Sequence, residues 1–244
     1  GGRPNLAGTT PLAGDGCLQV NARPHLDAAA MGFEILFTNL SHAPLRNLSI
    51  AMEPPSQLAL RYGPPPPGAE VQGRRVTVPV VYGLQGTAVA AAFTCAGVPT
   101  AQMRVPAFIT YTEDSPGSHE PRTISLSMTV SADQLLRQKV ITTQQFGEMW
   151  GQHGNQRKFN APTKSIATPQ AYMAAMVEDL HLAPVQVIGQ ECIMCGAFVG
   201  SGATVLVHAK VGLASGKAIE VTVRTKDARM SDIVQQLATH ALSR

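Results

Sequence analysis

Short runs of alternating apolar and polar residues, separated by segments rich in proline and glycine, fill the first half of this 244-residue chain. In residues 31–39, for example, Phe33, Ile35 and Phe37 alternate with Glu34 and Thr38, which would give a strand one apolar face. Runs of this kind predict strands at residues 17–21, 31–39, 47–53, 74–80, 88–94, 103–111 and 123–130. About seven short strands at this spacing indicate an antiparallel, immunoglobulin-like β-sandwich.

Helical periodicity first appears in the second half of the chain, around its single tryptophan. Thr142 or Thr143 can cap a helix, because a threonine hydroxyl accepts a hydrogen bond from one of the first free backbone N–H groups. Phe146, Met149 and Trp150 then fall on one face of that helix, at i, i+3 and i+4. The pattern therefore places Trp150 on a short helix at the junction between two kinds of sequence.

Beyond this helix, strand and helix patterns alternate. Residues 151–167 predict a polar loop, after which Thr168 and Pro169 begin a helix that reaches about residue 182. The buried stripe of this helix is predicted to be Tyr172, Met173, Met176, Val177 and Leu180. Strands are predicted at residues 185–188, 191–199, 204–211 and 219–224. Ser231 is expected to cap a last helix, which buries Ile233, Val234, Leu237 and Leu242.

Together these elements predict an α+β protein with two lobes. An N-terminal extension at residues 1–10 precedes an immunoglobulin-like β-sandwich at residues 11–135. Residues 136–244 form a C-terminal α/β platform, an antiparallel sheet with helices packed on one side. The chain begins Gly-Gly-Arg-Pro without a methionine, as expected for a piece of a longer protein.

The charge of the chain is small and unevenly distributed. Residues 1–135 hold eight Arg, no Lys and nine acids, which sum to −1, whereas residues 136–244 hold eleven Lys or Arg and seven acids, which sum to +4. Recognition of a polyanion usually needs a dense basic stripe, so we expect no nucleic-acid partner. The positive surplus of the second lobe suits acidic peptides better.

Cysteine, histidine and glycine patterns do not predict a catalytic or metal site. Cys192 and Cys195 form a single CxxC within a predicted strand, where side chains three positions apart point to opposite faces, so we interpret them as core residues. The sequence contains no GxSxG, HExxH or Walker motif, and its seven His are scattered. Residues 196–202 are rich in glycine but lie between strands, which favours a hairpin turn over a phosphate cradle. We therefore expect a protein without enzymatic activity and without a cofactor.

The candidate surface is the polar face of two strands beside the tryptophan helix. His208 and Lys210 share one face of residues 204–211, and Arg224 lies on the polar face of residues 219–224. If these faces adjoin Trp150, they form an aromatic floor with a cationic rim, which suits an Asp or Glu beside a Phe or Trp in an extended peptide. The alternatives are core packing for Phe146, Met149 and Trp150 and solvated strand charges for Lys210 and Arg224.

A second class of function follows from the sandwich and from two glycosylation patterns. Asn39 and Asn47 each begin an Asn-Leu-Ser sequence, which is the acceptor pattern for N-glycosylation. With a disulfide between Cys17 and Cys95, these features would indicate an extracellular adhesion or binding module.

Several phrases of the sequence resemble one known family. They are Ser125-Leu-Ser-Met-Thr-Val130, Leu135-Leu-Arg137, Thr142-Thr-Gln-Gln-Phe-Gly-Glu-Met-Trp150, His181-Leu182, Val187-Ile-Gly189 and Val221-Thr-Val-Arg-Thr-Lys-Asp227. Together they resemble the C-terminal appendage, or ear, of a large subunit of the clathrin-adaptor (adaptor protein complex) family. The sequence is most similar to the epsilon type of adaptor protein complex 4.

The resemblance implies a non-enzymatic hub in vesicle coat assembly and intracellular protein transport. Such an ear recruits accessory proteins, here epsin-like ones, through short linear motifs, and it joins the other adaptor subunits through a trunk. Its location would be cytoplasmic and peripheral, at Golgi and trans-Golgi network membranes, with only indirect membrane association.

The resemblance also implies a peptide-binding site at Phe146, Trp150, Lys210 and Arg224. In alpha-type ears a helix tryptophan, two phenylalanines and basic strand residues form this site. Gly147 replaces the second phenylalanine here, so we expect a shallower or differently shaped pocket.

Overall fold

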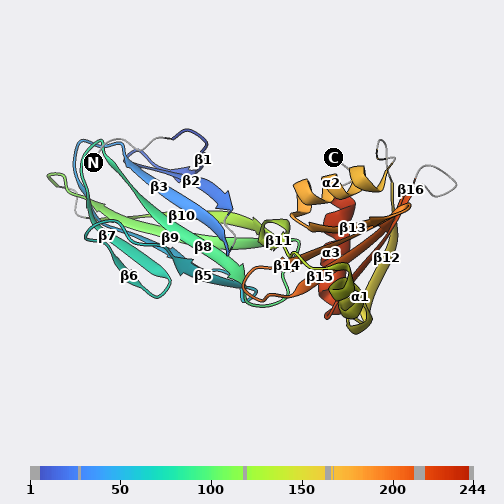
Figure 1. Ribbon diagram of the computed structural model, residues 1–244. Coiled ribbons are helices and arrows are strands. Elements are labelled where there is room, and N and C mark those ends of the chain that lie inside the picture. The colour runs from blue at the N-terminus through green and yellow to red at the C-terminus, as the bar shows by residue number, and fades with distance from the viewer. Residues whose placement is uncertain are drawn as a thin grey trace. The chain divides into compact units, whose positions relative to one another are not determined.

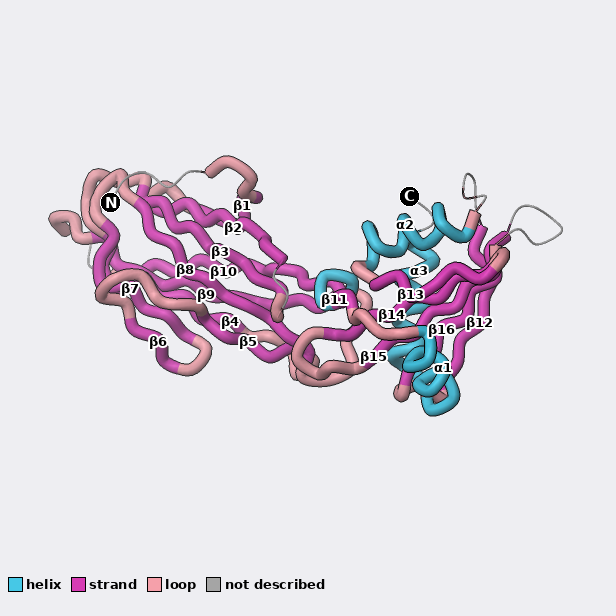
Figure 2. Tube along the Cα trace, viewed as in Figure 1, coloured by secondary structure: helices cyan, strands magenta, loops and turns pink. Residues whose placement is uncertain are grey.

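The chain folds into two units, which the computed structural model describes at residues 6–26, 29–117, 120–162, 166, 168–211 and 218–241 (Figure 1). The first unit comprises Gly1–Thr94 and Arg104–Val130, and the second comprises Cys95–Met103 and Ser131–Arg244. Within the described residues, every helix belongs to the second unit and the first unit is built from strands and loops (Figure 2).

Two five-stranded sheets form the sandwich of the first unit. One sheet has the order β1 (Thr10–Gly14), β2 (Leu18–Leu26), β3 (Met31–Asn39), β8 (Gly86–Cys95) and β5 (Leu58–Tyr62). The other has the order β10 (Pro121–Ser131), β9 (Gln102–Glu113), β4 (Leu45–Met52), β7 (Arg75–Val81) and β6 (Glu70–Gln72). Neighbouring strands such as β2 and β3, or β4 and β9, run antiparallel. The predicted sandwich is therefore confirmed.

Alternation of buried and more exposed side chains along strands such as β8, β9 and β10 helps to build the core between the two sheets. In β9, Val105, Ala107 and Ile109 are buried while Arg104 and Phe108 are exposed. All seven predicted strands are present, and β1, β5 and β6 are additions that the sequence pattern did not predict. These three strands are short and carry many exposed positions, so their alternation is too brief to stand out.

Asn39 is a structural residue of the sandwich. Its side chain is buried, with Nδ2 at 2.9 Å from the carbonyl oxygen of Ala43, 3.0 Å from that of Val81 and 3.1 Å from that of Tyr82. Its Oδ1 accepts a hydrogen bond from the backbone N–H of Ser41. An amide engaged in this way cannot carry a glycan in the folded protein.

The disulfide that would have supported an extracellular module is also not formed. Cys17 and Cys95 are both buried free thiols. Cys17 instead lies beside Arg122, whose guanidinium donates to its Sγ at 3.0 Å, and beside the Glu113 carboxylate. Of the features behind the extracellular alternative, only the glycosylation pattern at the exposed Asn47 remains.

A six-stranded antiparallel sheet is the centre of the second unit. Its order is β11 (Leu136–Gln138), β14 (Glu191–Phe198), β15 (Thr204–Lys210), β16 (Ala218–Thr225) and β12 (Asn155–Pro162), and β13 (Ala183–Ile188) pairs with another part of β14. The strand β12 contradicts the predicted loop at residues 151–167. The sequence of β12 does not show a strand pattern, because polar side chains such as Gln156 and Lys158 occupy its exposed face.

Helices cover both faces of this sheet, rather than one face as predicted. The helices α2 (Pro169–Leu180) and α3 (Ala228–Ala241) pack together on one face, and α1 (Thr143–Gln152) packs on the opposite face, against Ile193, Cys195 and Leu206 (Figure 1). The short helix η1 (Asp133–Leu135) precedes β11. Burial from both sides explains the almost continuous apolar sequence of β14 and β15.

The helix limits agree with the sequence at α2 and differ at α3. Thr168 caps α2 as predicted, and Tyr172, Met176 and Leu180 are fully buried. The cap of α3 is Asp227 rather than Ser231, because Asp227 Oδ1 accepts from the backbone N–H groups of Arg229 and Met230. Ser231 is instead buried inside the helix.

The predicted burial of the last helix is only partly confirmed. Val234 is buried and Ile233 and Leu237 are partly exposed, while Leu242 lies outside the described residues. No helix among the described residues has the length and apolar character needed to span a bilayer.

We predict that Asn39→Ala lowers the free energy of unfolding of the sandwich by about 2–3 kcal/mol, because it leaves buried carbonyl groups without a donor. Urea unfolding followed by far-UV circular dichroism measures this loss. The matched control is Asn47→Gly, since Asn47 is exposed and has φ 52°, a left-handed conformation that glycine adopts readily. Equal stabilities of the two variants would contradict the structural role of Asn39.

Candidate functional site

The helix α1 begins as its sequence predicts. Thr142 is the N-cap, and its hydroxyl accepts a hydrogen bond from the backbone N–H of Gln145 at 3.2 Å. The Gln145 side chain returns the interaction by accepting from the Thr142 backbone N–H at 2.9 Å. This capping box fixes the first turn and so sets which residues of α1 face the sheet.

Phe146 attaches α1 to the sheet. Its side chain is 5% exposed and lies in a cluster with Ile193, Cys195 and Leu206 from β14 and β15. Burial of a phenylalanine ring contributes roughly 2–3 kcal/mol. Phe146 is therefore a core residue beneath the surface, while Met149 and Trp150 pack only partly buried at the border of the same cluster.

Three side chains hold the indole ring of Trp150. The Phe146 ring is stacked on it with centroids 5.4 Å apart, and the guanidinium carbon of Arg224 lies 4.4 Å from the indole centroid. The His208 ring meets it edge-on, with centroids 5.9 Å apart. A partly exposed tryptophan held in this way is a rigid apolar contact surface with a cation beside it.

Arg224 has a fixed orientation. Its Nη1 donates to the carbonyl oxygen of Trp150 at 2.7 Å, and its Nε and Nη2 both donate to Oε1 of Gln156, at 3.0 and 2.7 Å. Gln156 is the direct partner of Arg224 in the pairing of β12 with β16. The guanidinium thus connects the C-terminal half of α1 with two strands and cannot leave the indole ring without breaking these hydrogen bonds.

The positive charge of Lys210 is compensated within the protein. Lys210 Nζ lies 3.5 Å from Oε1 of Glu191, and His208 Nε2 lies 2.9 Å from Oε2 of the same carboxylate. Glu191 and Lys210 are direct neighbours in the pairing of β14 with β15. The hydrogen bond from His208 is the main reason that the pKa of Glu191 is lowered, and the nearby Lys210 charge adds to this effect. Glu191 therefore remains ionised on this surface.

The structure brings three of the four predicted residues into contact, and the fourth, Lys210, is connected to them through Glu191 and His208. Trp150 and Arg224 are in contact, Phe146 lies beneath them, and Lys210 is on the same face two positions from His208 in β15. His208 was predicted on the candidate surface but not among the four site residues, and Glu191 and Gln156 were not predicted there at all. The alternation of β15 already placed His208 beside Lys210, whereas Glu191 and Gln156 come close only through strand pairing.

Gly147 leaves an opening beside this cluster. It is exposed on α1, and a Cβ atom built at this position would meet no atom within 4 Å. The space beside Gly147, one residue after Phe146, is therefore open, and the shape of the expected pocket stays a prediction.

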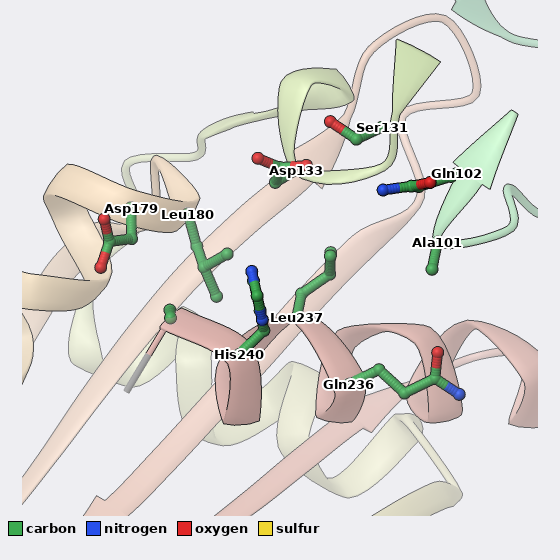
Figure 3. A pocket seen from close by; sticks show the side chains of 10 residues that line it. Ala101, Gln102, Ser131, Asp133, Asp179, Leu180, Gln236, Leu237 and His240 are labelled. Atoms are coloured by element: carbon green, nitrogen blue, oxygen red, sulfur yellow. The ribbon is translucent and has the colours of Figure 1, made fainter. Parts of the chain in front are cut away.

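A separate hollow of about 320 Å³ lies elsewhere in the second unit (Figure 3). Side chains from η1, α2 and α3 line it, including Asp133, Leu180, Leu237 and His240. None of the four predicted site residues lines this hollow. Within the described part of the chain, no three His, Cys, Asp or Glu side chains gather in a way that could hold a metal ion.

His153 fixes the C-terminal end of α1. Its ring is 2% exposed, and Nδ1 lies 2.7 Å from the carbonyl oxygen of Met149. A carbonyl oxygen can only accept, so Nδ1 carries the proton and Nε2 of the neutral ring is an acceptor. Burial lowers the pKa of His153, and the charges of Lys226 and Lys139 lower it further.

Most of the second unit matches a family model for an adaptin appendage platform, and the adaptin appendages are a non-enzymatic family of vesicle-transport adaptors. More particularly, residues 139–241 match the family model described as the Adaptin AP4 complex epsilon appendage platform. The resemblance identified in the sequence is confirmed by this match.

Two solved structures are similar to part of the chain. The GAE domain of GGA2p from Saccharomyces cerevisiae shares 16% identity with a TM-score of 0.38, over 50% of this chain and 96% of that one. The structure described as the yeast GGA1_GAE domain-P21 shares 11% identity with this chain and has a TM-score of 0.37. The match covers 49% of this chain and 97% of that one. No curated protein matches the sequence.

We predict that His153 makes the platform less stable in mild acid. Since the pKa of His153 is lower in the folded than in the unfolded protein, the unfolded state binds the additional proton and stability falls as the pH drops below about 6.5. His153→Asn keeps a donor near the Nδ1 position and removes the titration. Thermal unfolding of both proteins between pH 7.5 and about pH 5 measures the difference. The slope of melting temperature against pH should be shallower in the variant, and an unchanged slope would contradict the prediction.

Proposed function

We propose that this chain is the appendage of an epsilon-type adaptor subunit and that its platform recruits accessory proteins by binding their short linear motifs. We further propose that it acts on the cytoplasmic side of trans-Golgi network membranes, attached to the other adaptor subunits through a trunk, with epsin-like proteins as partners. The family of the platform supports the general role. The peptide site, the partners and the location are our inferences.

One observation carries the proposal for the site: Trp150 is partly exposed on a polar sheet face, yet its orientation is fixed by Phe146, Arg224 and His208. A preorganised aromatic side chain loses little conformational entropy when a ligand binds, which is why tryptophan and arginine are frequent in energetically important contacts. The opening beside Gly147 would accept an apolar or aromatic side chain of the ligand next to Phe146 and Trp150.

The cations near Trp150 already have partners within the protein, and an acidic ligand would have to compete with those partners. Lys210 and His208 both interact with Glu191, and Arg224 is engaged with Trp150 and Gln156. An acidic group of a peptide would therefore compete with the Glu191 carboxylate for Lys210. We expect weak binding of single motifs, with useful avidity only when several motifs engage several appendages.

Short peptides that place Phe beside Asp or Glu provide the test, with alanine-substituted peptides as negative controls. Because Trp150 is the only tryptophan, its fluorescence reports on this surface directly. We expect Trp150→Ala to weaken binding about tenfold or more in calorimetry. Tyr82→Ala, which removes an exposed aromatic ring of the sandwich, should leave affinity unchanged. A panel that never changes the Trp150 emission, together with equal binding by Trp150→Ala, would refute the site.

The competing carboxylate gives a second test. Glu191→Gln should strengthen binding of the acidic peptide about threefold, because it releases Lys210 and His208 for the ligand, and the gain should shrink at high salt. The control is Glu178→Gln, which removes the same charge from the exposed side of α2. Weaker or unchanged binding by Glu191→Gln would show that Lys210 does not contact the acidic group.

A further inference from the structure

A hollow of about 390 Å³ adjoins the C-terminal end of α1. Side chains from three parts of the platform line it: Lys139 before α1, Met149 and His153 at the end of α1, and Lys226 and Met230 around the start of α3. The turn between β14 and β15, with Thr204 at its end, completes the wall. Of the proposed peptide-contact residues, none lines this hollow.

The charged groups of the hollow give it a positive surplus. Lys139 Nζ donates to Oγ1 of Thr204 at 2.6 Å, and Lys226 is exposed. Among the described residues, neither lysine forms an ion pair. Asp227, the acidic residue of the lining, already accepts two backbone N–H groups of α3. Two ammonium groups are therefore available for an anion.

His153 adds a specific requirement for the ligand. Its Nδ1 donates to Met149, so its Nε2 is an acceptor, and Nε2 is buried without a hydrogen-bond partner in the described structure. Buried acceptors almost always have a donor, so a hydrogen-bond donor is expected at this atom when the hollow is filled. Met149 and Met230 line the same space, and their unbranched side chains can move to admit it.

We propose that this hollow binds the phosphate group of a phosphorylated serine or threonine in a partner peptide. The two lysine ammonium groups would contact the anionic phosphate oxygens, and His153 Nε2 would share the remaining phosphate proton. A carboxylate at neutral pH brings negative charge but no proton, so an aspartate would leave Nε2 unpaired. A phosphomonoester has its second pKa near 6, so close to that pH its monoanion carries both the negative charge and the proton. This site depends on the proposed function, because the phosphorylated residue would belong to an accessory protein that the platform recruits.

The test uses N-acetyl-phosphoserine amide as the probe, with N-acetyl-aspartate amide and inorganic phosphate for comparison. Binding is followed by the ¹H–¹³C resonance of the His153 ring in nuclear magnetic resonance spectra. We expect saturable shifts with the phosphoserine probe, about tenfold weaker binding of the aspartate probe, and intermediate affinity for inorganic phosphate, which lacks the contacts of the serine backbone with the methionines. Equal affinity for inorganic phosphate would overturn the assignment to a phosphopeptide.

Variants separate the contributions of charge and hydrogen bonding. Lys139→Gln combined with Lys226→Gln should weaken phosphoserine binding about tenfold, whereas Lys158→Gln, which removes a lysine of β12 paired with Glu220, should have no effect. His153→Asn should reduce the preference for phosphoserine over aspartate, measured through backbone amide resonances of residues 201–204. Equal losses in the Lys158→Gln control, or an unchanged preference in His153→Asn, would overturn the proposal.

The outcome is distinguishable from that of the Trp150 experiments. Trp150→Ala should leave binding of the phosphoserine probe intact, because Trp150 does not line the hollow. If acidic-aromatic peptides fail to bind while the phosphoserine probe binds as described, the motif site is wrong and the phosphate site stands. If those peptides bind and no probe shifts the His153 resonance, the phosphate site is wrong.

Discussion

The attachment of α1 to the sheet through Phe146 determines where the side chains of the candidate surface lie. The ring is buried against Ile193, Cys195 and Leu206, and Trp150, one helical turn further on, must then lie at the border of this apolar cluster. A capping box fixes the beginning of the helix, and the bond between His153 and Met149 fixes its end. Both of the ligand surfaces that we propose therefore depend on one short helix whose position is set by a single buried ring.

This arrangement explains why the platform sheet is more apolar than an ordinary one-sided sheet. The strands β14 and β15 are covered by α1 on one face and by α2 and α3 on the other, so both sets of alternating side chains are buried over part of their length. Polar residues on the face that carries α1 include His208 in β15 and Arg224 in β16, which both contact Trp150. The surface that we propose for peptide binding therefore lies beside α1 on this face of the sheet.

Local patterns predicted much of this structure because they encode local structure. The alternation of the sandwich strands, the Thr142 and Thr168 caps and the position of Trp150 on a helix face all depend on residues close in sequence. The strand β12 could not be found in this way, since its residues are polar and it is recognised only by pairing with β16. The prediction of Ser231 as a helix cap was wrong for a similar reason. Its hydroxyl forms hydrogen bonds with the Thr225 hydroxyl and the Asn155 carbonyl oxygen inside the fold, and a capping pattern in the sequence does not reveal these partners.

On the candidate surface, too, features set by residues close in sequence were predicted, whereas contacts made through strand pairing were not. The sequence placed Lys210 and Arg224 on polar strand faces, but it could not show that Glu191 would lie opposite Lys210 or that Gln156 would bind the Arg224 guanidinium. These contacts arise from the register between strands that are far apart along the chain. Counting cations therefore overestimated the free positive charge, whereas the position of the aromatic residues was predicted well.

Gly147 has a consequence for how recognition is divided between the two partners. In a cluster of aromatic rings at an interface, a given ring can come from the receptor or from the peptide and make the same packing contacts. On the proposed surface the receptor contributes Trp150, which is stacked on the buried Phe146, and leaves open space at Gly147. Selectivity then belongs largely to the motif, because only a peptide that carries its own ring would complete the cluster. Because Gly147 has no side chain, the bound peptide would itself supply the missing ring of the aromatic cluster.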